Sequence, residues 1–311
     1  INYQLSIINY QLSIINYQLS IIHLGDKMKN IKAIFIDLDG TLVGHEGIVA
    51  QESVDILHEL MKQGIKIVIS TGRNYIQAKK ITKNIKGLWY ITNNGAYVVD
   101  DNHILLFSKP LEQNKFLKFV DEALEFKGLN IFVQNHEKIV TNSTTWGRFK
   151  TAFSKDFFKK ISISNIRAFF HREASVGREI KHIENPRDFF VNTKENWLKA
   201  LVTGNSTAVK YLSEKYKDEY SISFSHSDNI EVNAKGVSKG DAIKTLCEML
   251  NIDLADTMCF GDSGNDIEMF KVVGIPVVMG NSEVEELGKL AKYKAKNYDE
   301  LGVYHFLKEH F

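Results

Sequence analysis

Residues 31–41 read Ile31-Lys32-Ala33-Ile34-Phe35-Ile36-Asp37-Leu38-Asp39-Gly40-Thr41, an apolar run that ends in acid. A short, mostly apolar run of this kind predicts a buried strand. The pattern then continues with helical spacing over 50–62, a second apolar run at 65–70, a helical stretch from Asn74 and a strand-like run at 88–92. The order strand, helix, strand, helix, strand predicts a parallel sheet with covering helices, and so an α/β fold.

The pattern changes after residue 95. Segments 97–99 and 104–107, separated by the turn residues Asp100-Asp101-Asn102, predict a hairpin. From Leu111 to about Thr203, helix-like and strand-like stretches alternate without strands that end in acid. After Gly236 the earlier pattern resumes, so we expect a second domain inserted into the first.

The domain boundaries are expected at approximate positions. We predict that 28–107 and 205–311 form the core domain and that 108–204 form the inserted domain. The strand-like segments 220–224 and 230–232 could still belong to the insertion or flank its hinge. The length remaining after residue 27 suits two domains.

The composition describes an ordinary folded protein, with 44% hydrophobic and 25% charged residues. Lys plus Arg number 39 against 38 Asp plus Glu, so no overall charge favours nucleic acid or an anionic membrane. No apolar run reaches the roughly 18 residues of a spanning helix, and we expect a cytoplasmic protein. Cys247 and Cys259 are predicted to be core thiols. The oligomeric state stays open.

Residues 1–27 differ from the rest, because the heptapeptide Ile-Asn-Tyr-Gln-Leu-Ser-Ile occurs three times before Met28. Apolar and polar residues alternate within each copy, but the register flips at each junction. We interpret the segment as a repetitive leader that is unstructured or not native. The alternative is a self-association segment in an assembly protein, which a chain that starts at Met28 would test.

Acidic residues follow two of the predicted strands. Asp37 and Asp39 end the first strand, and Asp262 and Asp266 follow a later one. Ligands bind at the carboxyl ends of parallel strands, so these four carboxylates are expected to converge. Their repulsion must be relieved by protons or by a hard cation, for which Mg²⁺ is suited. Lys239 supplies a positive charge near them.

Plainer interpretations of these residues remain open. The segment 37–41 could be a strand that ends in an Asp-Gly turn, and Lys239 could be an exposed lysine. A calcium loop is excluded, because its glycine and glutamate positions hold Leu42 and Ile48. The chain also lacks the Gly-x-x-x-x-Gly-Lys and Gly-x-Gly-x-x-Gly phosphate loops.

Taken together, the segments resemble motifs I to IV of the haloacid dehalogenase-like (HAD) superfamily. Residues 28–311 are similar to its Cof-type phosphatases, which carry a type IIB cap. This resemblance implies an α/β fold with a Rossmann-like parallel-sheet HAD core and an inserted α+β cap domain. The segments that carry it are 37–41, 70–73, 92–96, 236–240, 261–266, 279–281 and 299–303.

The resemblance also implies a role for each residue. Asp37 would be the nucleophile that forms an aspartyl-phosphate, and Asp39 would be the general acid and then the base. Asp37, the backbone carbonyl of Asp39, and Asp262 would hold Mg²⁺, with Asp266 in the outer shell. The expected phosphate-binding groups are the backbone amides of Leu38 and Gly72 together with Thr71, Lys239 and Asn265.

The expected function is Mg²⁺-dependent hydrolysis of a small phosphorylated metabolite, such as a sugar phosphate. A phosphomutase or a sugar-phosphate-specific phosphatase of the same superfamily is the alternative. A non-enzymatic phospho-acceptor is disfavoured, because Asp39 supplies the acid that turnover needs. Arg73 and Asn94 receive no catalytic role, and the phenylalanines between 149 and 170 are expected to be cap core.

Overall fold

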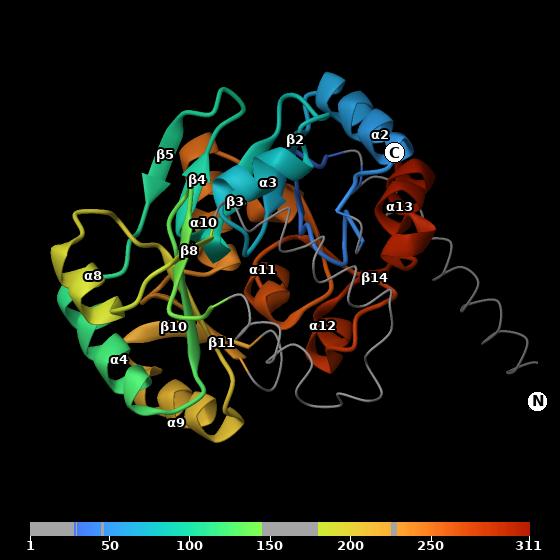
Figure 1. The fold of residues 1–311 in the computed structure, drawn as a ribbon. Helices are drawn as coiled ribbons and strands as arrows, with labels where there is room; N and C mark the ends of the chain where they lie inside the picture. Colours follow the sequence, from blue (N-terminus) through green and yellow to red (C-terminus); the bar gives the residue numbers. More distant parts are fainter. Residues whose placement is uncertain (1–27, 29, 45–46, 145–179, 225–228) are drawn as a thin grey trace, which may run out of the picture.

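The computed structural model describes residues 28, 30–44, 47–144, 180–224 and 229–311. They form two sheets, each with its own helices (Figure 1). The repetitive leader and the phenylalanine-rich segment 149–170 lie outside the described residues. Among the described residues, no helix combines the length and apolar character that crossing a membrane requires.

The first sheet has eight strands, six of them parallel. In spatial order they are β14 (Tyr293–Lys294), β13 (Ile275–Val278), β12 (Thr257–Gly261), β1 (Ala33–Ile36), β2 (Lys66–Ser70), β3 (Trp89–Thr92), β4 (Tyr97–Val99) and β5 (Leu105–Ser108). The strands from β14 to β3 are parallel, and β4 and β5 add the predicted antiparallel hairpin at one edge. The predicted parallel core sheet is therefore confirmed.

Helices cover both faces of this sheet, because both faces of its strands are apolar. Along β1, Ile34 and Ile36 belong to one hydrophobic cluster and Phe35 belongs to another. The helices on the first face are α2 (Gln51–Lys62), α3 (Tyr75–Ile81) and α13 (Gly302–His310). Those on the other face are α10 (Lys239–Leu250), α11 (Ile267–Phe270) and α12 (Glu285–Leu290). Cys247 and Cys259 are buried there, as predicted.

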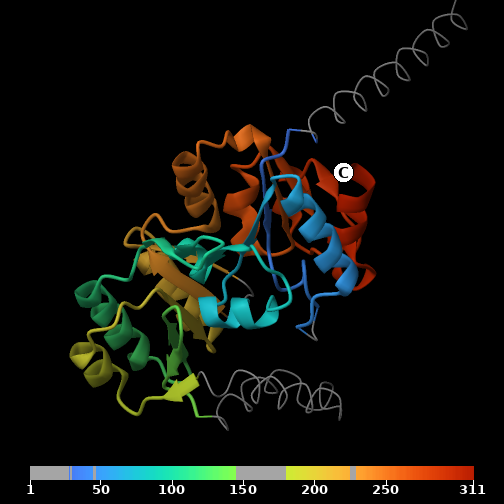
Figure 2. The ribbon, with the colours of Figure 1, turned by 90° about the horizontal axis from the view of Figure 1, so that it is seen from above.

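The second sheet has six strands, and the helices described for this unit, within 108–144, 180–224 and 229–236, pack on one of its faces. In spatial order its strands are β10 (Tyr220–Ser223), β11 (Asn229–Ala234), β9 (Lys199–Thr203), β6 (Asn130–Gln134), β7 (Ile139–Thr141) and β8 (Ile180–His182). Its helices are α4 (Gln113–Glu125), α8 (Pro186–Asn192) and α9 (Ser206–Tyr216). Apolar side chains of alternate strand residues pack with these helices in one cluster. Figure 2 shows this unit beside the first sheet.

The structure moves the second domain boundary. The expected core segment began at residue 205, but β10 and β11 are strands of the second sheet, and α9 packs against that sheet. Strand β11 pairs antiparallel with β9, and Ile230 and Val232 are fully buried in the same cluster as Val202. Residues 220–223 and 229–234 are therefore strands of the second sheet. The chain returns to the first domain near Val237, just before α10.

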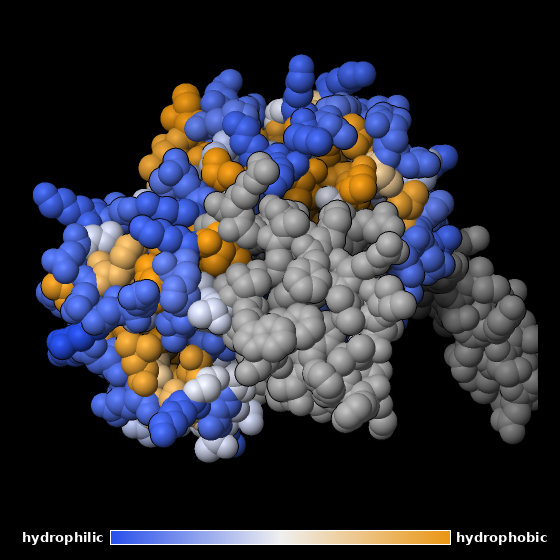
Figure 3. All heavy atoms as spheres, viewed as in Figure 1, coloured by the Kyte–Doolittle hydropathy of each residue, from blue (hydrophilic) through white to orange (hydrophobic). Residues whose placement is uncertain are grey.

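The described surface on the face drawn in Figure 3 is mainly polar. On the face drawn in Figure 3, hydrophilic side chains cover most of the described surface, and hydrophobic ones occur in separate groups. Scattered groups of this kind are usual on soluble proteins and mark no site by themselves. The polar residues of the interior are therefore more informative about function.

Candidate active site

Three neighbouring strands of the first sheet end at the predicted polar segments. Strand β1 lies between β2 and β12, so Asp37, Thr71 and Asp262 follow adjacent strand ends. The carboxylates of Asp37, Asp262 and Asp266 offer oxygen atoms that all lie within 4.8 Å of one another. Three of the four predicted aspartates therefore converge.

Lys239 lies between two of these carboxylates. Its Nζ donates to Oδ1 of Asp37 and to Oδ1 of Asp266, each at 2.6 Å. Lys239 is fully buried, so the alternative of an exposed lysine is wrong. It is the first residue of α10, whose N-cap Ser238 accepts a bond from the Asp241 N–H at 3.0 Å. This cap fixes the start of the helix and with it the position of Lys239.

The Lys239 ammonium stays charged despite its burial. Burial lowers the pKa of Lys239, but the adjacent Asp266 and Asp37 carboxylates outweigh this effect and raise the pKa above its ordinary value. Burial also raises the pKa of Asp37 well above its ordinary value, although Lys239 opposes that shift. Ionising all three acids beside this one cation would leave an excess of negative charge, and the raised pKa of Asp37 reflects burial together with that cost.

Asp266 braces the loop that carries Asp262. Its Oδ2 accepts the backbone N–H groups of Asp262 at 2.9 Å and of Ser263 at 3.0 Å, while its Oδ1 binds Lys239. Asp266 is fully buried. With these three bonds it fixes the loop relative to α10.

Asp262 has one oxygen that is bonded and one that is not. Its Oδ2 accepts from Asn281 Nδ2 at 3.1 Å, whereas its buried Oδ1 has no hydrogen-bond partner among the described residues. Burial and then Asp266 raise the pKa of Asp262 to about 7. Asn281 also donates to the Gly40 carbonyl at 2.9 Å, so it joins the loops after β1 and β12.

Gly40 is required by this close packing. It has a φ of +79°, and a Cβ atom there would lie 2.3 Å from Asp262 Oδ2. Only glycine accommodates both the left-handed backbone and the approach of the carboxylate.

The donor set fits a hard divalent cation. Three carboxylates face one lysine, and the unbonded Asp262 Oδ1 is an unsatisfied buried acceptor. A cation that prefers oxygen ligands, such as Mg²⁺, would satisfy that oxygen and balance the charge. Asp37, Asp262 and Asp266 together offer the oxygen atoms that could hold such a cation.

Asp39 lies apart from the three clustered acids. Its side chain is 51% exposed and forms a two-bond ion pair with Arg73, with both N···O distances at 2.7 Å. No catalytic role was expected for Arg73 from the sequence. In the sequence, only its position two residues after Thr71 pointed to the ion pair with Asp39. That position puts Arg73 in the loop after β2, next to the loop after β1 that carries Asp39.

The expected phosphate-binding groups line the same loops. Thr71 is buried, and its Oγ1 accepts from the Arg73 N–H at 3.2 Å. Among the described residues, the backbone N–H groups of Leu38 and Gly72 have no hydrogen-bond acceptor. Asn265 Nδ2 donates to Asn94 Oδ1 at 3.3 Å. Unpaired amides beside a lysine are suited to binding an anion.

Asn94, for which we expected no catalytic role, joins the two domains. It is buried with a φ of +59°, and its Nδ2 donates to Glu231 Oε2 at 2.6 Å and to Asn233 Oδ1 at 3.3 Å. Both acceptors belong to β11 of the second sheet. The segment Thr92-Asn93-Asn94-Gly95-Ala96 was recognisable in the sequence as one that resembles the HAD superfamily. The sequence did not indicate that Asn94 would bind Glu231 and Asn233.

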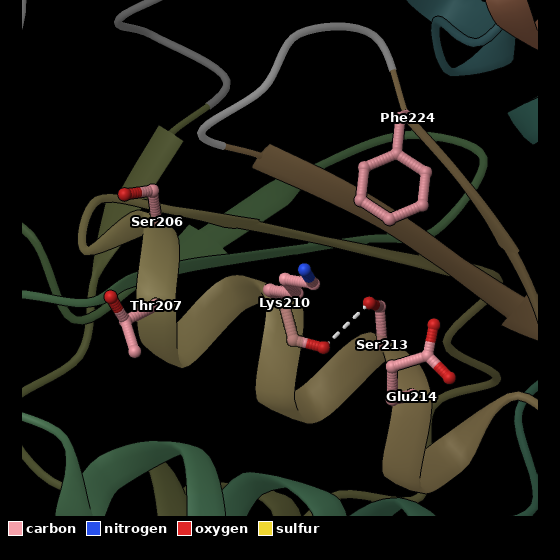
Figure 4. Close-up of a pocket in the computed structure, with 6 residues that line it drawn as sticks. All are labelled: Ser206, Thr207, Lys210, Ser213, Glu214 and Phe224. Atoms are coloured by element: carbon pink, nitrogen blue, oxygen red, sulfur yellow. Dashed lines mark hydrogen bonds between the residues drawn. The ribbon is translucent and has the colours of Figure 1, made fainter.

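A separate hollow lies on the second domain. It has a volume of about 450 Å³ and is bordered by α9 and by Phe224 (Figure 4). Its only drawn hydrogen bond joins Ser213 to the Lys210 carbonyl within the helix. It contains none of the clustered acids, and the candidate site is therefore the sheet edge at Asp37.

Comparison with known proteins agrees with this geometry. The sequence model of the haloacid dehalogenase-like hydrolases matches residues 34–307. A proposed phosphatase of Streptococcus pyogenes is 30% identical over 294 residues, covering 90% of this chain and 98% of the relative. Phosphatase YwpJ of Bacillus subtilis is 26% identical over 292 residues, covering 89% and 99%.

Solved structures share the fold. A haloacid dehalogenase-like hydrolase from B. subtilis is 25% identical with a TM-score of 0.78, covering 90% of this chain and all of the other. The HAD subclass IIB sugar phosphatase BT4131 is 25% identical with a TM-score of 0.69, covering 89% and 98%. The predicted family and fold are confirmed: the chain belongs to the haloacid dehalogenase-like hydrolases, as a Cof-type phosphatase.

Proposed function

We propose that the chain hydrolyses phosphate monoesters of small metabolites, with Mg²⁺ as cofactor and Asp37 as the nucleophile. One observation carries this proposal: Asp37 Oδ1 is held at 2.6 Å by the fully buried Lys239, in a group of three carboxylates. This arrangement orients one Asp37 oxygen through Lys239 and leaves Oδ2 for attack on phosphorus. Phosphoryl transfer depends mainly on such positioning and charge neutralisation.

The reaction has two steps. Asp37 attacks phosphorus and forms an aspartyl-phosphate, while the ester oxygen leaves and takes a proton from Asp39. Asp39 then removes a proton from water, which attacks the phosphoryl group, releases phosphate and restores Asp37. Because Asp39 is paired with Arg73 in this structure, it must leave that pair to reach the ester oxygen.

The chain neutralises the phosphate charge from several sides. Lys239 and the N–H groups of Leu38 and Gly72 are placed to bind phosphate oxygens, together with the Thr71 hydroxyl and the Asn265 amide. Mg²⁺, held by Asp37, the Asp39 carbonyl and Asp262, would add positive charge at the attacked phosphoryl group. Asp266 keeps Lys239 and the Asp262 loop in place.

A sugar phosphate is the substrate class that we propose to examine first. One structural relative is a sugar phosphatase that covers nearly the whole chain. The second sheet, which would face such a substrate, presents polar side chains toward the first domain. Lys199 and Asn233 are among them.

A substrate panel with and without Mg²⁺ tests the proposal. Phosphate release would be measured for an aryl phosphate and for sugar phosphates, without any bisphosphate activator. We expect release that requires Mg²⁺ and stops when a chelator is added. Phosphate release that the chelator does not reduce would exclude Mg²⁺ as the cofactor. Turnover that occurs only with a bisphosphate activator would indicate a phosphomutase.

A further inference from the structure

Two buried residues of the second sheet form an ion pair next to the active site. Lys199 and Glu231 are only 4% and 8% exposed, and Lys199 Nζ lies 2.8 Å from Glu231 Oε1. They come from β9 and β11, on residues that alternate with the apolar ones facing the helices of the second domain. The pair thus lies on the face of this sheet that meets the first domain.

Each member of the pair also binds the first domain. Lys199 Nζ donates to the Gly72 carbonyl at 2.8 Å, and Glu231 Oε2 accepts from Asn94 Nδ2 at 2.6 Å. Asn94 Oδ1 in turn accepts from Asn265 Nδ2 at 3.3 Å. The ion pair is therefore bonded to two residues that are expected to bind phosphate: to Gly72 through its carbonyl, and to Asn265 through Asn94.

Neighbouring strands repeat this connection. Gln134 and Asn233 pair with Lys199 across the sheet, so the three residues form one row. Gln134 Nε2 donates to the same Gly72 carbonyl at 2.9 Å, and Asn233 Nδ2 donates to the Asn93 carbonyl at 2.9 Å. Two donors on one carbonyl fix the orientation of the peptide after Gly72.

The space around Gly72 leaves little freedom. A Cβ atom on Gly72 would lie 2.9 Å from both Lys199 Nζ and Asn94 Oδ1. Burial raises the pKa of Glu231, but Lys199 and Asn94 outweigh it, so its pKa lies below the ordinary value. Glu231 is thus ionised at neutral pH, and the pair is complete.

We propose that Glu231 and Lys199 are positioning residues, through which the second domain sets the geometry of Gly72 and Asn265 for phosphate binding. This inference rests on the proposed function. The pair touches no reacting atom and acts through Asn94 and the Gly72 carbonyl. A purely structural pair would support the stability of the domain contact but would leave phosphate affinity unchanged.

The experiment measures the inhibition constant of inorganic phosphate, together with KM and the unfolding midpoint. Glu231→Gln keeps the shape of the side chain but removes the charge that Lys199 and Asn94 bind. We expect the inhibition constant and KM to rise by roughly tenfold or more, because one partner of a buried, hydrogen-bonded pair is lost. The double variant Lys199→Met with Glu231→Leu removes both charges, which is far less costly to the fold. It should show the same loss of phosphate affinity.

Glu122→Gln is the matched control. Like Glu231, Glu122 accepts a hydrogen bond from a lysine, here Lys215, and it also accepts from Tyr211 and Tyr216. Glu122 lies on α4 of the second domain, outside the group of clustered acids. We expect it to leave phosphate inhibition unchanged, even where it lowers the unfolding midpoint.

The outcomes separate the inference from the proposed function. Suppose that the wild-type chain releases no phosphate and that inorganic phosphate does not raise its unfolding midpoint. The proposed function then fails, and the inference fails with it. If the wild type does both and the folded double variant binds phosphate as the wild type does, only the inference is overturned. An equal loss in Glu122→Gln would also overturn it, since general destabilisation would then explain the effect.

Discussion

Replacing Lys239 by methionine tests the electrostatic core of the site. Lys239 is fully buried and bonds Asp37 and Asp266 at 2.6 Å each, so the substitution leaves two buried carboxylates without their cation. Removing one partner of a buried ion pair costs about 3–5 kcal/mol. We therefore expect Lys239→Met to lower the free energy of unfolding at pH 7 by about that amount.

Urea denaturation of the metal-free protein measures this change, and phosphate release measures the effect on turnover. Lys215→Met is the control, because Lys215 pairs with Glu122 while its side chain is 47% exposed. Exposed pairs of this kind contribute little to stability, because solvent and salt screen them. The loss of unfolding free energy in Lys239→Met should become smaller in acid, because protons neutralise the two carboxylates there. The variant should also lose its phosphatase activity.

A Lys239→Met variant that is no less stable than Lys215→Met would contradict the electrostatic role of Lys239. Retained activity in Lys239→Met would refute the role of this lysine in phosphate binding. Loss of stability with full activity would leave Lys239 as a structural residue only.

Two further predictions concern Asp262 and its neighbour. The pKa of Asp262 is about 7 in the fold against an ordinary 3.8, so the folded state holds this proton more tightly. Its contribution to the stability of the metal-free protein is full below pH 3.8 and is lost as pH rises through 7. Urea titrations at several pH values should show this loss in the wild type and not in Asp262→Asn, and an equal slope in both would contradict the assignment. Gly40→Ala should lower both stability and turnover, because its Cβ would lie 2.3 Å from Asp262 Oδ2. Gly64→Ala, which has a φ of +87° but no atom within 4 Å of its Cβ, should cost only the backbone strain of about 1–2 kcal/mol.

Much of the catalytic core could be predicted from sequence. Asp37 and Asp262 each follow an apolar run that forms a strand, and these two strands are parallel neighbours in the sheet. The parallel topology alone therefore brings the two carboxylates together. Lys239 could be associated with them because it begins the helix after a recognisable segment. Its burial between two carboxylates was not readable, since a lone lysine is ordinarily exposed.

The rest depended on how the two domains meet. The segment 229–234 alternates apolar and polar residues, which fits a half-buried strand in either domain, and its pairing with β9 decides between them. Asn94 is bound by Glu231, which lies 137 positions away along the chain. Contacts of this kind have no local pattern, and only the folded chain reveals them. The same is true of the pair between Asp39 and Arg73.

The covalent state of Asp37 during turnover is the most direct test of the account. The protein would be mixed with Mg²⁺ and a phosphorylated substrate, quenched within the first turnover, and digested for mass spectrometry. Asp39→Asn should accumulate the intermediate, because the base for water attack is missing. We expect one phosphoryl group on the peptide that contains Asp37. In Asp37→Asn this group should be absent, and turnover should fall by about 10³-fold or more. Full turnover in Asp37→Asn, or a phosphoryl group on another residue, would contradict it.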